Sequence, residues 1–317
     1  METLISQKVE RSTNPLRQSP RDRRREIMDF LTGFTIETTP GSAAKTPDFR
    51  EQLRPGTTVY ITFLQGSDFE DTIKVACRLR NEGFNPVPHI CARSTPSKAV
   101  LDKNLRRLVQ DAGVTRVLAI SGAVSAPLGE FQDTMQMLGT GLFDKHGIQH
   151  IGVAGHPEGS PDISDAAITQ ALRWKNDFAE RTDADIYIVT QFCFEAEPII
   201  EWDKRLRMEG NRLPIHIGIP GLATIKTLMG HAKACGIGPS MRFLSRQAMN
   251  VAKLLVVSAP DKLVAALAAY KATEPDCGIA AVHMFPLGGL KKSADWSYAV
   301  VDGRFSLSSD ATEFKVN

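Results

Sequence analysis

Eight short apolar runs recur along the chain, and segments with helical patterns separate most of them. The runs are rich in Val, Ile, Phe and Tyr, which is typical of buried β-strands. They cover residues 34–38, 58–63, 85–92, 115–121, 150–155, 185–192, 214–221 and 278–287. Strands that alternate with helices in this way pair in parallel through right-handed crossovers. The eight repeats therefore predict an α/β fold, a (β/α)8 TIM barrel.

The segments between the runs carry apolar residues at helical spacing. We expect helices over 70–82, 98–112, 165–181, 198–210 and 223–235, and two helices within 241–272 that break near Pro260. Residues 39–57 are the weakest interval, with one short helical turn near 49–53. The main alternative is an open doubly wound sheet. The first run is followed by Thr39-Pro40-Gly41 rather than by G-x-G-x-x-G, and G-x-x-x-x-G-K-[ST] is absent, so the barrel is favoured.

The length of the chain fits one barrel with an extension at its N-terminus. The chain has 317 residues, whereas a barrel needs about 250. Residues 1–20 lack periodicity and predict a flexible arm, and residues 21–317 are predicted to form a single barrel domain that begins with a helix over 21–32. The basic run 21–26 precedes Ile27 and Phe30, which favours the solvated start of a helix over a binding arm.

The charge balance and the cysteines limit the partners and the compartment. A formal net charge of +2 does not favour nucleic acid or an anionic membrane. Five cysteines without a C-x-x-C pair indicate reduced thiols. The N-terminus lacks the apolar segment of a signal peptide, and no apolar run approaches the ~18 residues of a membrane span. We expect a cytoplasmic homo-oligomer that binds neither nucleic acid nor membranes.

Polar residues stand at the C-terminal ends of nearly all predicted strands, where barrel enzymes place their chemistry. In chain order they are Glu37, Thr62, His89, Ser121-Gly122, His156 with Glu158, Thr190 with Gln191, the turn 218–221, and His283 with Phe285. Ordinary structural roles stay open for most of them, since a lone histidine is commonly a satisfied core residue and Gln191 could cap a neighbouring carbonyl. Glu37 is the hardest to dismiss. A buried carboxyl without a partner has a raised pKa, as a general acid requires.

A metal centre is the rival interpretation of His89, His156 and His283 together with Glu37. These histidines lie on different predicted strands, and no H-x-H or H-E-x-x-H spacing occurs. The G-x-S-x-G motif of many serine hydrolases is absent as well. We therefore predict no metal ligands and no serine nucleophile.

Several of these segments together resemble the methylenetetrahydrofolate reductase family, which are FAD-dependent (β/α)8 enzymes. They are the strand that contains Glu37, PVPHICAR (86–93), GVAGHPEGSPD (152–162), VTQFCFE (189–195) and VHMFPL (282–287). The resemblance spans roughly residues 34–290. It implies a flavin-dependent oxidoreductase of one-carbon metabolism and methionine biosynthesis. Such an enzyme interconverts 5,10-methylenetetrahydrofolate and 5-methyltetrahydrofolate by hydride transfer at flavin N5.

The resemblance also implies roles for single residues. Glu37 matches the acid that protonates N10 of the folate and opens its five-membered ring. Substrate positions are matched by Gln191, which suits the donors and acceptors of a pterin edge, and by Ile225 and Phe285. The positions near FAD are matched by Thr62, His89, Ser121, Gly122, Ala123, Ala154, His156 and Lys175.

Two of these positions depart from the family pattern. Ala123 stands where the family has a carboxylate near flavin N1. Without that negative charge the reduced flavin should be more stable, which biases the enzyme towards oxidation of methyltetrahydrofolate. Ile225 replaces an aromatic residue, which leaves NAD(P)H open as the electron donor. A flavin-free methyl-transfer protein that binds a pterin, or a non-catalytic folate-binding subunit, remains an alternative on the same barrel.

Overall fold

Eight parallel strands close into a barrel in the computed structural model, which describes residues 20–234 and 255–316. The order around the barrel is β1-β10-β7-β6-β5-β4-β3-β2. The strands are β1 (Thr35–Thr38), β2 (Thr58–Ile61), β3 (Asn85–Cys91), β4 (Arg116–Ile120), β5 (His150–Gly155), β6 (Asp185–Phe192), β7 (Ile215–Pro220) and β10 (Ile279–Phe285). Each of the eight predicted strands is present, and the predicted (β/α)8 barrel is confirmed.

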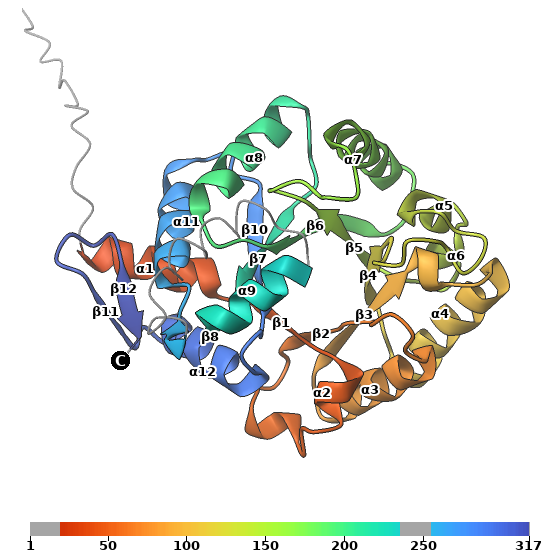
Figure 1. The fold of residues 1–317 in the computed structure, drawn as a ribbon, viewed down its shortest axis with the longest axis horizontal. Coiled ribbons are helices and arrows are strands. Elements are labelled where there is room, and N and C mark those ends of the chain that lie inside the picture. The colour runs from red at the N-terminus through yellow and green to blue at the C-terminus, as the bar shows by residue number, and fades with distance from the viewer. Residues whose placement is uncertain (1–19, 235–254, 317) are drawn as a thin grey trace, which may run out of the picture.

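Helices form a ring around these strands (Figure 1). The long ones are α1 (Pro20–Leu31), α3 (Phe69–Asn81), α4 (Lys98–Ala112), α7 (Asp165–Ala179), α8 (Ala196–Met208), α11 (Asp261–Thr273) and α12 (Leu290–Val301). The predicted helices over 21–32, 70–82, 98–112, 165–181 and 198–210 are confirmed to within two residues at each end. Side-chain caps explain several starts: Asp68, Ser97 and Ser164 each accept a hydrogen bond from a backbone N–H of the first turn.

Shorter elements fill the loops. They are α2 (Pro40–Ala43), α5 (Thr134–Leu138), α6 (Leu142–Lys145), α9 (Ile225–Ala234) and the 3-10 turns Phe49–Glu51 and Ala92–Ser94. The turn predicted near 49–53 is therefore present, whereas α2, α5, α6 and the long α12 had no sequence prediction. The helix predicted over 223–235 begins two residues late. Its end, the first of the two helices predicted within 241–272, Cys235 and nearly all of the arm 1–20 lie outside the described residues.

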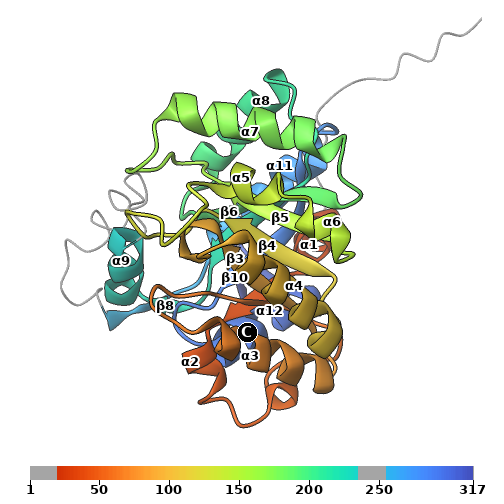
Figure 2. The same ribbon diagram turned by 90° about the vertical axis from the view of Figure 1, so that its right-hand side faces the viewer.

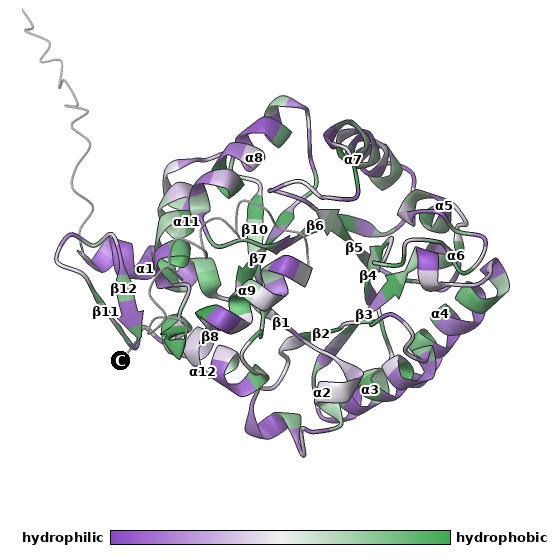
Figure 3. Ribbon diagram, in the orientation of Figure 1, coloured by the Kyte–Doolittle hydropathy of each residue, from purple (hydrophilic) through white to green (hydrophobic). Residues whose placement is uncertain are grey.

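The main core lies between the strands and the surrounding helices, and apolar residues are concentrated in the strands (Figure 3). A second, smaller cluster fills the inside of the barrel with Tyr60, Val87, Leu118, Tyr187 and Val189. The hydroxyl groups of Tyr60 and Tyr187 hydrogen-bond to each other at 2.8 Å across the interior. Aromatic residues of two strands thus close the middle of the barrel.

Gly152 of β5 makes room for this interior cluster. A Cβ atom at this position would lie 3.0 Å from Leu118 and from the Tyr187 ring, which is tighter than most real Cβ contacts. A larger side chain would force one of these two residues out of its place. The glycine therefore sets the position of Tyr187 on the barrel axis.

The start of α1 is not simply solvated, contrary to the expectation for the run 21–26. Arg23 is 6% exposed and donates hydrogen bonds to the carbonyl oxygens of Ala265 in α11 and Ala311 near the C-terminus. Arg24 donates to the carbonyls of Gly303 and Phe305. The guanidinium groups satisfy buried carbonyls, which the sequence pattern did not reveal. They attach α1 to the C-terminal hairpin of β11 (Phe305–Leu307) and β12 (Phe314–Val316).

A small antiparallel pair, β8 (Ala223–Thr224) with β9 (Val257–Ser258), follows the end of β7. Figure 2 shows β8 and α9 together at one end of the molecule, away from α1 and α6. Since β8 comes directly after β7, this is the end to which the C-termini of the barrel strands point. Among the described helices none is both long and apolar enough to span a bilayer.

Candidate active site

A buried carboxylate and a buried histidine meet at the C-terminal end of the barrel. Glu37 of β1 and His283 of β10 lie on neighbouring strands, and Nε2 of His283 is 3.5 Å from Oε2 of Glu37. The side chain of His283 is fully buried and that of Glu37 is 15% exposed. On the other side of the ring, Nδ1 of His283 lies 2.8 Å from the hydroxyl of Thr35. The histidine is thus held in place, and the carboxylate keeps an open side.

The pKa of Glu37 differs from the value expected from the sequence. Burial raises the pKa of this carboxyl, but the contact with His283, and then the nearby His89 and Thr62, more than offset that effect. The pKa therefore lies below its usual value, and Glu37 rests as a carboxylate. The expectation of an unpaired acid with a raised pKa was wrong, because its partner lies far away in the sequence on the last strand.

Besides Nε2 of His283, two buried polar atoms without a hydrogen-bond partner lie beside Glu37. Nε2 of His89 on β3 is one of them, and burial lowers the pKa of this histidine to about 4, so the ring is neutral at neutral pH. The other is the hydroxyl oxygen of Thr62, which is close enough to Glu37 to lower its pKa but is not in hydrogen-bonding geometry in the described residues. Such buried orphans are rare, and a bound ligand commonly satisfies them.

The loop after β4 is fixed against β3. The backbone N–H of Arg93 donates to the carbonyl of Ser121, whose hydroxyl lies 3.1 Å from that of Thr134. Gly122 has φ +90°, and a Cβ there would lie 3.2 Å from Cβ of Cys91. Only glycine allows both this positive φ and this close approach to Cys91. Ala123 then follows at an exposed position.

Lys175 and His156 approach each other at the end of β5. The ammonium group of Lys175 on α7 is buried and donates one hydrogen bond, of 3.3 Å, to the carbonyl of Ala154. Burial lowers the pKa of Lys175 to about 8. Burial and then the charge of Lys175 lower the pKa of His156 to about 4. A buried cation with so few partners is suited to hold an anionic group.

The tight loop 156–159 carries Glu158. Its backbone closes with a hydrogen bond from Gly159 N to the carbonyl of His156, and Gly159 has φ +76°. Burial and then the charge of Glu158 raise the pKa of the Cys193 thiol, which places this carboxylate against the end of β6. Glu158 therefore lies between the loop 156–159 and the end of β6.

Gln191 sits on a bulge between β6 and β7. The strand register shifts between Val189 and Phe192, and the Thr190 hydroxyl accepts a hydrogen bond of 2.8 Å from the backbone N–H of Gly218. A Cβ on Gly218 would lie 2.6 Å from the carbonyl oxygen of Gln191. The glycine permits this close approach, and the bulge sets the direction of Gln191.

Aromatic rings line the same end of the barrel. The Phe285 ring lies 4.8 Å from His283 and 5.2 Å from Phe192, measured between centroids. The Tyr60 ring lies 4.4 Å from His283 on the opposite side. Sequence reasoning missed Tyr60, whose only signal was its place in the second strand. Ile225 is 4% exposed and packs in a separate apolar cluster with residues of α9.

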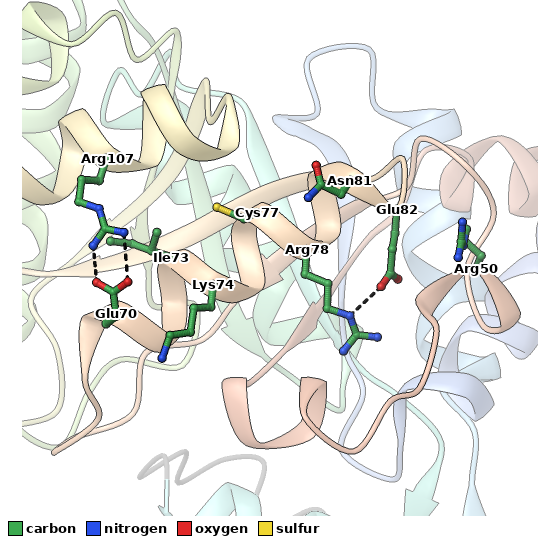
Figure 4. A pocket seen from close by; sticks show the side chains of 9 residues that line it. All are labelled: Arg50, Glu70, Ile73, Lys74, Cys77, Arg78, Asn81, Glu82 and Arg107. Atoms are coloured by element: carbon green, nitrogen blue, oxygen red, sulfur yellow. Dashed lines mark hydrogen bonds and ion pairs between the residues drawn. The ribbon is translucent and has the colours of Figure 1, made fainter.

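A hollow with a volume of about 500 Å³ lies on the outer face of the barrel, along α3. Figure 4 shows the side chains that line it. Its basic side chains are paired with acids: Arg107 with Glu70, and Arg78 with Glu82. Such local pairing leaves little net charge to select a ligand. Across 20–234 and 255–316, no cluster of three or more His, Cys, Asp or Glu residues has the geometry of a metal site.

The fold and the site define a class: (β/α)8-barrel proteins with a buried Glu–His pair at the C-terminal end of the strands. Within that class, the chain belongs to the family described as methylenetetrahydrofolate reductase, whose sequence model matches residues 46–284. The family resemblance seen in the sequence is therefore confirmed.

Two solved structures are similar to this chain. One is an uncharacterised protein from Clostridium thermocellum, described as binding two copies of 5-methyl-5,6,7,8-tetrahydrofolic acid, with TM-score 0.51 and 14% identity over 88% of this chain and 97% of that one. The other is a xylose isomerase domain containing protein from Salmonella typhimurium LT2, with TM-score 0.37 and 12% identity over 85% of this chain and 97% of that one. At such identity the first likeness shows the fold alone.

Proposed function

We propose that this protein is a flavin-dependent oxidoreductase that interconverts 5,10-methylenetetrahydrofolate and 5-methyltetrahydrofolate. The observation that carries the proposal is the ionised Glu37 beside the buried His283, which faces the open end of the barrel. Membership of the methylenetetrahydrofolate reductase family supports it. The similar protein from Clostridium thermocellum, described as a binder of methyltetrahydrofolate, agrees with a folate as substrate.

The residues present fit FAD. Thr62 and His89 offer buried polar atoms that lack partners in the described structure, and Lys175 offers a buried ammonium that suits a diphosphate. Gly122 allows close approach of a ligand to the backbone after β4. Bound FAD would supply the redox chemistry by exchanging a hydride at N5 with the one-carbon unit of the folate.

Glu37 would exchange a proton with N10 of the folate. In the reductive direction, the proton that opens the ring reaches N10 from the pair formed by Glu37 and His283. In the oxidative direction, N10 loses a proton as the ring closes, and the Glu37 carboxylate accepts it. Because the pKa of Glu37 is lowered, its resting state is the base that oxidation of methyltetrahydrofolate needs.

The other site residues would bind and orient the substrate. Gln191, directed by the bulge at Gly218, would pair with the pterin edge, since an amide offers both a donor and an acceptor. Phe285 would pack against the flat ring system beside His283. Ala123, exposed and uncharged, would leave the flavin N1 region without a nearby carboxylate, which favours the reduced flavin and hence the oxidative direction.

An absorption spectrum of the purified protein tests the proposal first. Flavin bands are expected, and anaerobic addition of 5-methyltetrahydrofolate should bleach them. A colourless protein that still binds 5-methyltetrahydrofolate would refute the flavin and favour the methyl-transfer or folate-binding alternative.

Variants test the assignments of single residues. Glu37→Gln should still bind flavin. The rate at which 5-methyltetrahydrofolate bleaches that flavin should fall about 100-fold or more, as expected for loss of a general acid–base. Gln191→Glu should weaken folate binding without releasing flavin, and loss of flavin instead would show that the site is misplaced. Ala123→Asp should lower the bound-flavin potential by about 30 mV or more, equivalent to about 1.4 kcal/mol for a two-electron couple. An unchanged flavin potential in this variant would contradict the proposal that Ala123 favours oxidation of methyltetrahydrofolate.

A further inference from the structure

A cavity of about 690 Å³ opens at the N-terminal end of the barrel, opposite the proposed folate site. Three of its lining residues are the first residues of adjacent strands: Arg116 of β4, His150 of β5 and Asp185 of β6. His216 of β7 completes the inner wall. The buried Tyr60–Tyr187 hydrogen bond lies between this cavity and Glu37, so the two sites are separate.

The cavity lining carries two arginines, Arg116 and Arg212, and two carboxylates, Glu180 and Asp185, and only Arg212 is paired with one of them. Arg212 at its rim pairs with Glu180 at 2.5 Å, and Nδ1 of His150 lies 3.2 Å from Asp185. Arg116 forms no ion pair with any carboxylate in the part of the chain that the structure describes. Its guanidinium lies over the Tyr187 ring, 5.5 Å from the centroid. One positive charge therefore faces the cavity without an acidic partner.

His216 adds an unsatisfied donor beside this charge. Its ring lies 4.3 Å from the Tyr187 ring, and its Nδ1 atom is buried with no hydrogen-bond partner among the described residues. Burial, and then the charges of Arg116 and His283, lower the pKa of His216 to about 4. The ring is thus neutral at neutral pH, and one of its two tautomers presents an N–H at Nδ1.

We propose that this cavity binds a small organic carboxylate. The Arg116 guanidinium takes the carboxylate in a two-pronged contact, and Nδ1 of His216 donates a further hydrogen bond. The apolar wall, which includes Leu213 and Pro214, contacts the body of the ligand. A planar guanidinium matches a planar carboxylate better than any other side chain does. The volume lies within the range of about 300–1,000 Å³ usual for small-molecule sites.

Benzoate is the probe, and benzamide is its uncharged control. Calorimetric titration of the full-length protein should show saturable binding of benzoate and none of benzamide. With ¹³C-labelled histidine, the NMR titration of His216 should show that bound benzoate raises its pKa, because a negative charge then offsets that of Arg116. Arg116→Gln should weaken benzoate about ten- to a hundredfold, as expected for a charge-assisted hydrogen bond.

Arg212→Gln is the matched control, since it removes a cation from the same rim that is already paired with Glu180. It should change benzoate binding less than about threefold. Arg116→Lys covers the case in which Arg116→Gln does not fold. It should weaken benzoate binding too, because a lysine cannot make the two-pronged contact of the planar guanidinium. The proposal is overturned if benzoate does not bind, if benzamide binds equally, if inorganic phosphate binds in place of benzoate, or if Arg116→Lys binds benzoate as the wild type does.

Discussion

The pair of Glu37 and His283 makes a prediction that needs no substrate. His283→Gln removes the imidazole that neighbours a buried carboxylate but leaves a polar side chain of similar size. A polar contact with a charged group contributes about 1.5–3 kcal/mol. Because Glu37 is 15% exposed, we expect a loss near 2 kcal/mol at neutral pH.

The pH dependence has a definite sign. In the wild type the pKa of Glu37 is lowered, so its contribution to stability is present above the usual value of 4.5 and is lost as the pH falls through the lower, folded-state pKa. In His283→Gln, burial is opposed only by His89 and Thr62, and we expect it to outweigh them and raise this pKa. The variant should therefore gain stability on acidification from neutral pH, and the difference from the wild type should shrink to about 1 kcal/mol near pH 4.

Urea unfolding between pH 4 and 7.5 measures this difference. The set comprises the wild type, Glu37→Gln, His283→Gln and the double variant, so that the coupling energy of the pair is obtained directly. His216→Gln, which replaces another histidine inside the barrel, is the control and should show no change in slope of this kind. If the stability difference of His283→Gln stays constant with pH, the two side chains do not interact as described.

Three further predictions concern other parts of the molecule. Lys175 has a pKa of about 8, so FAD affinity of the flavin-free protein should fall as the pH rises from 7 to 9 as the ammonium is lost. Fluorescence titration should show that the FAD affinity of Lys175→Met depends less on pH. Equal pH dependence in the variant and the wild type would mean that Lys175 does not contact the diphosphate. Gly152→Val should destabilise by about 1–3 kcal/mol through overpacking against Tyr187; an unchanged urea midpoint would mean that the interior can rearrange. Arg23→Ala should cost about 2–3 kcal/mol because it leaves buried carbonyls without donors; the exposed Arg25→Ala should cost less than about 0.5 kcal/mol, and equal costs would contradict the proposed attachment.

The barrel could be predicted because its strands are continuous apolar runs, and such runs are the strongest local signal in a sequence. Most long helices followed from their apolar spacing and from caps such as Ser97 and Ser164. The long helix α12 was not predicted, although Trp296 and Val300 have helical spacing, because most of its buried positions are Ser or Ala and form no apolar stripe. The short α5 and α6 carry too few turns to show a period.

The sequence predicted where the site residues stand on the strands, but it did not predict the protonation state of Glu37. Glu37 and His283 were both found as polar strand ends, yet their contact depends on the closure of β1 against β10. Sequence separation hides this pairing, so the pKa of Glu37 was given the wrong direction. The N-terminal cavity had no sequence signal either, because Arg116, His150 and His216 stand at the starts of strands, where a basic residue is unremarkable.

The contacts of α1 have a consequence for synthesis on the ribosome. Arg23 needs the carbonyls of Ala265 and Ala311, and β1 needs β10 as its neighbour. Until those late segments have emerged, the growing chain presents an open edge of β1 and an apolar face of α1 with nothing to cover them. The edge of β1 and the apolar face of α1 are therefore exposed to aggregation until the late segments leave the ribosome. The yield of folded protein in a cell should depend on chaperones that protect these surfaces during that time.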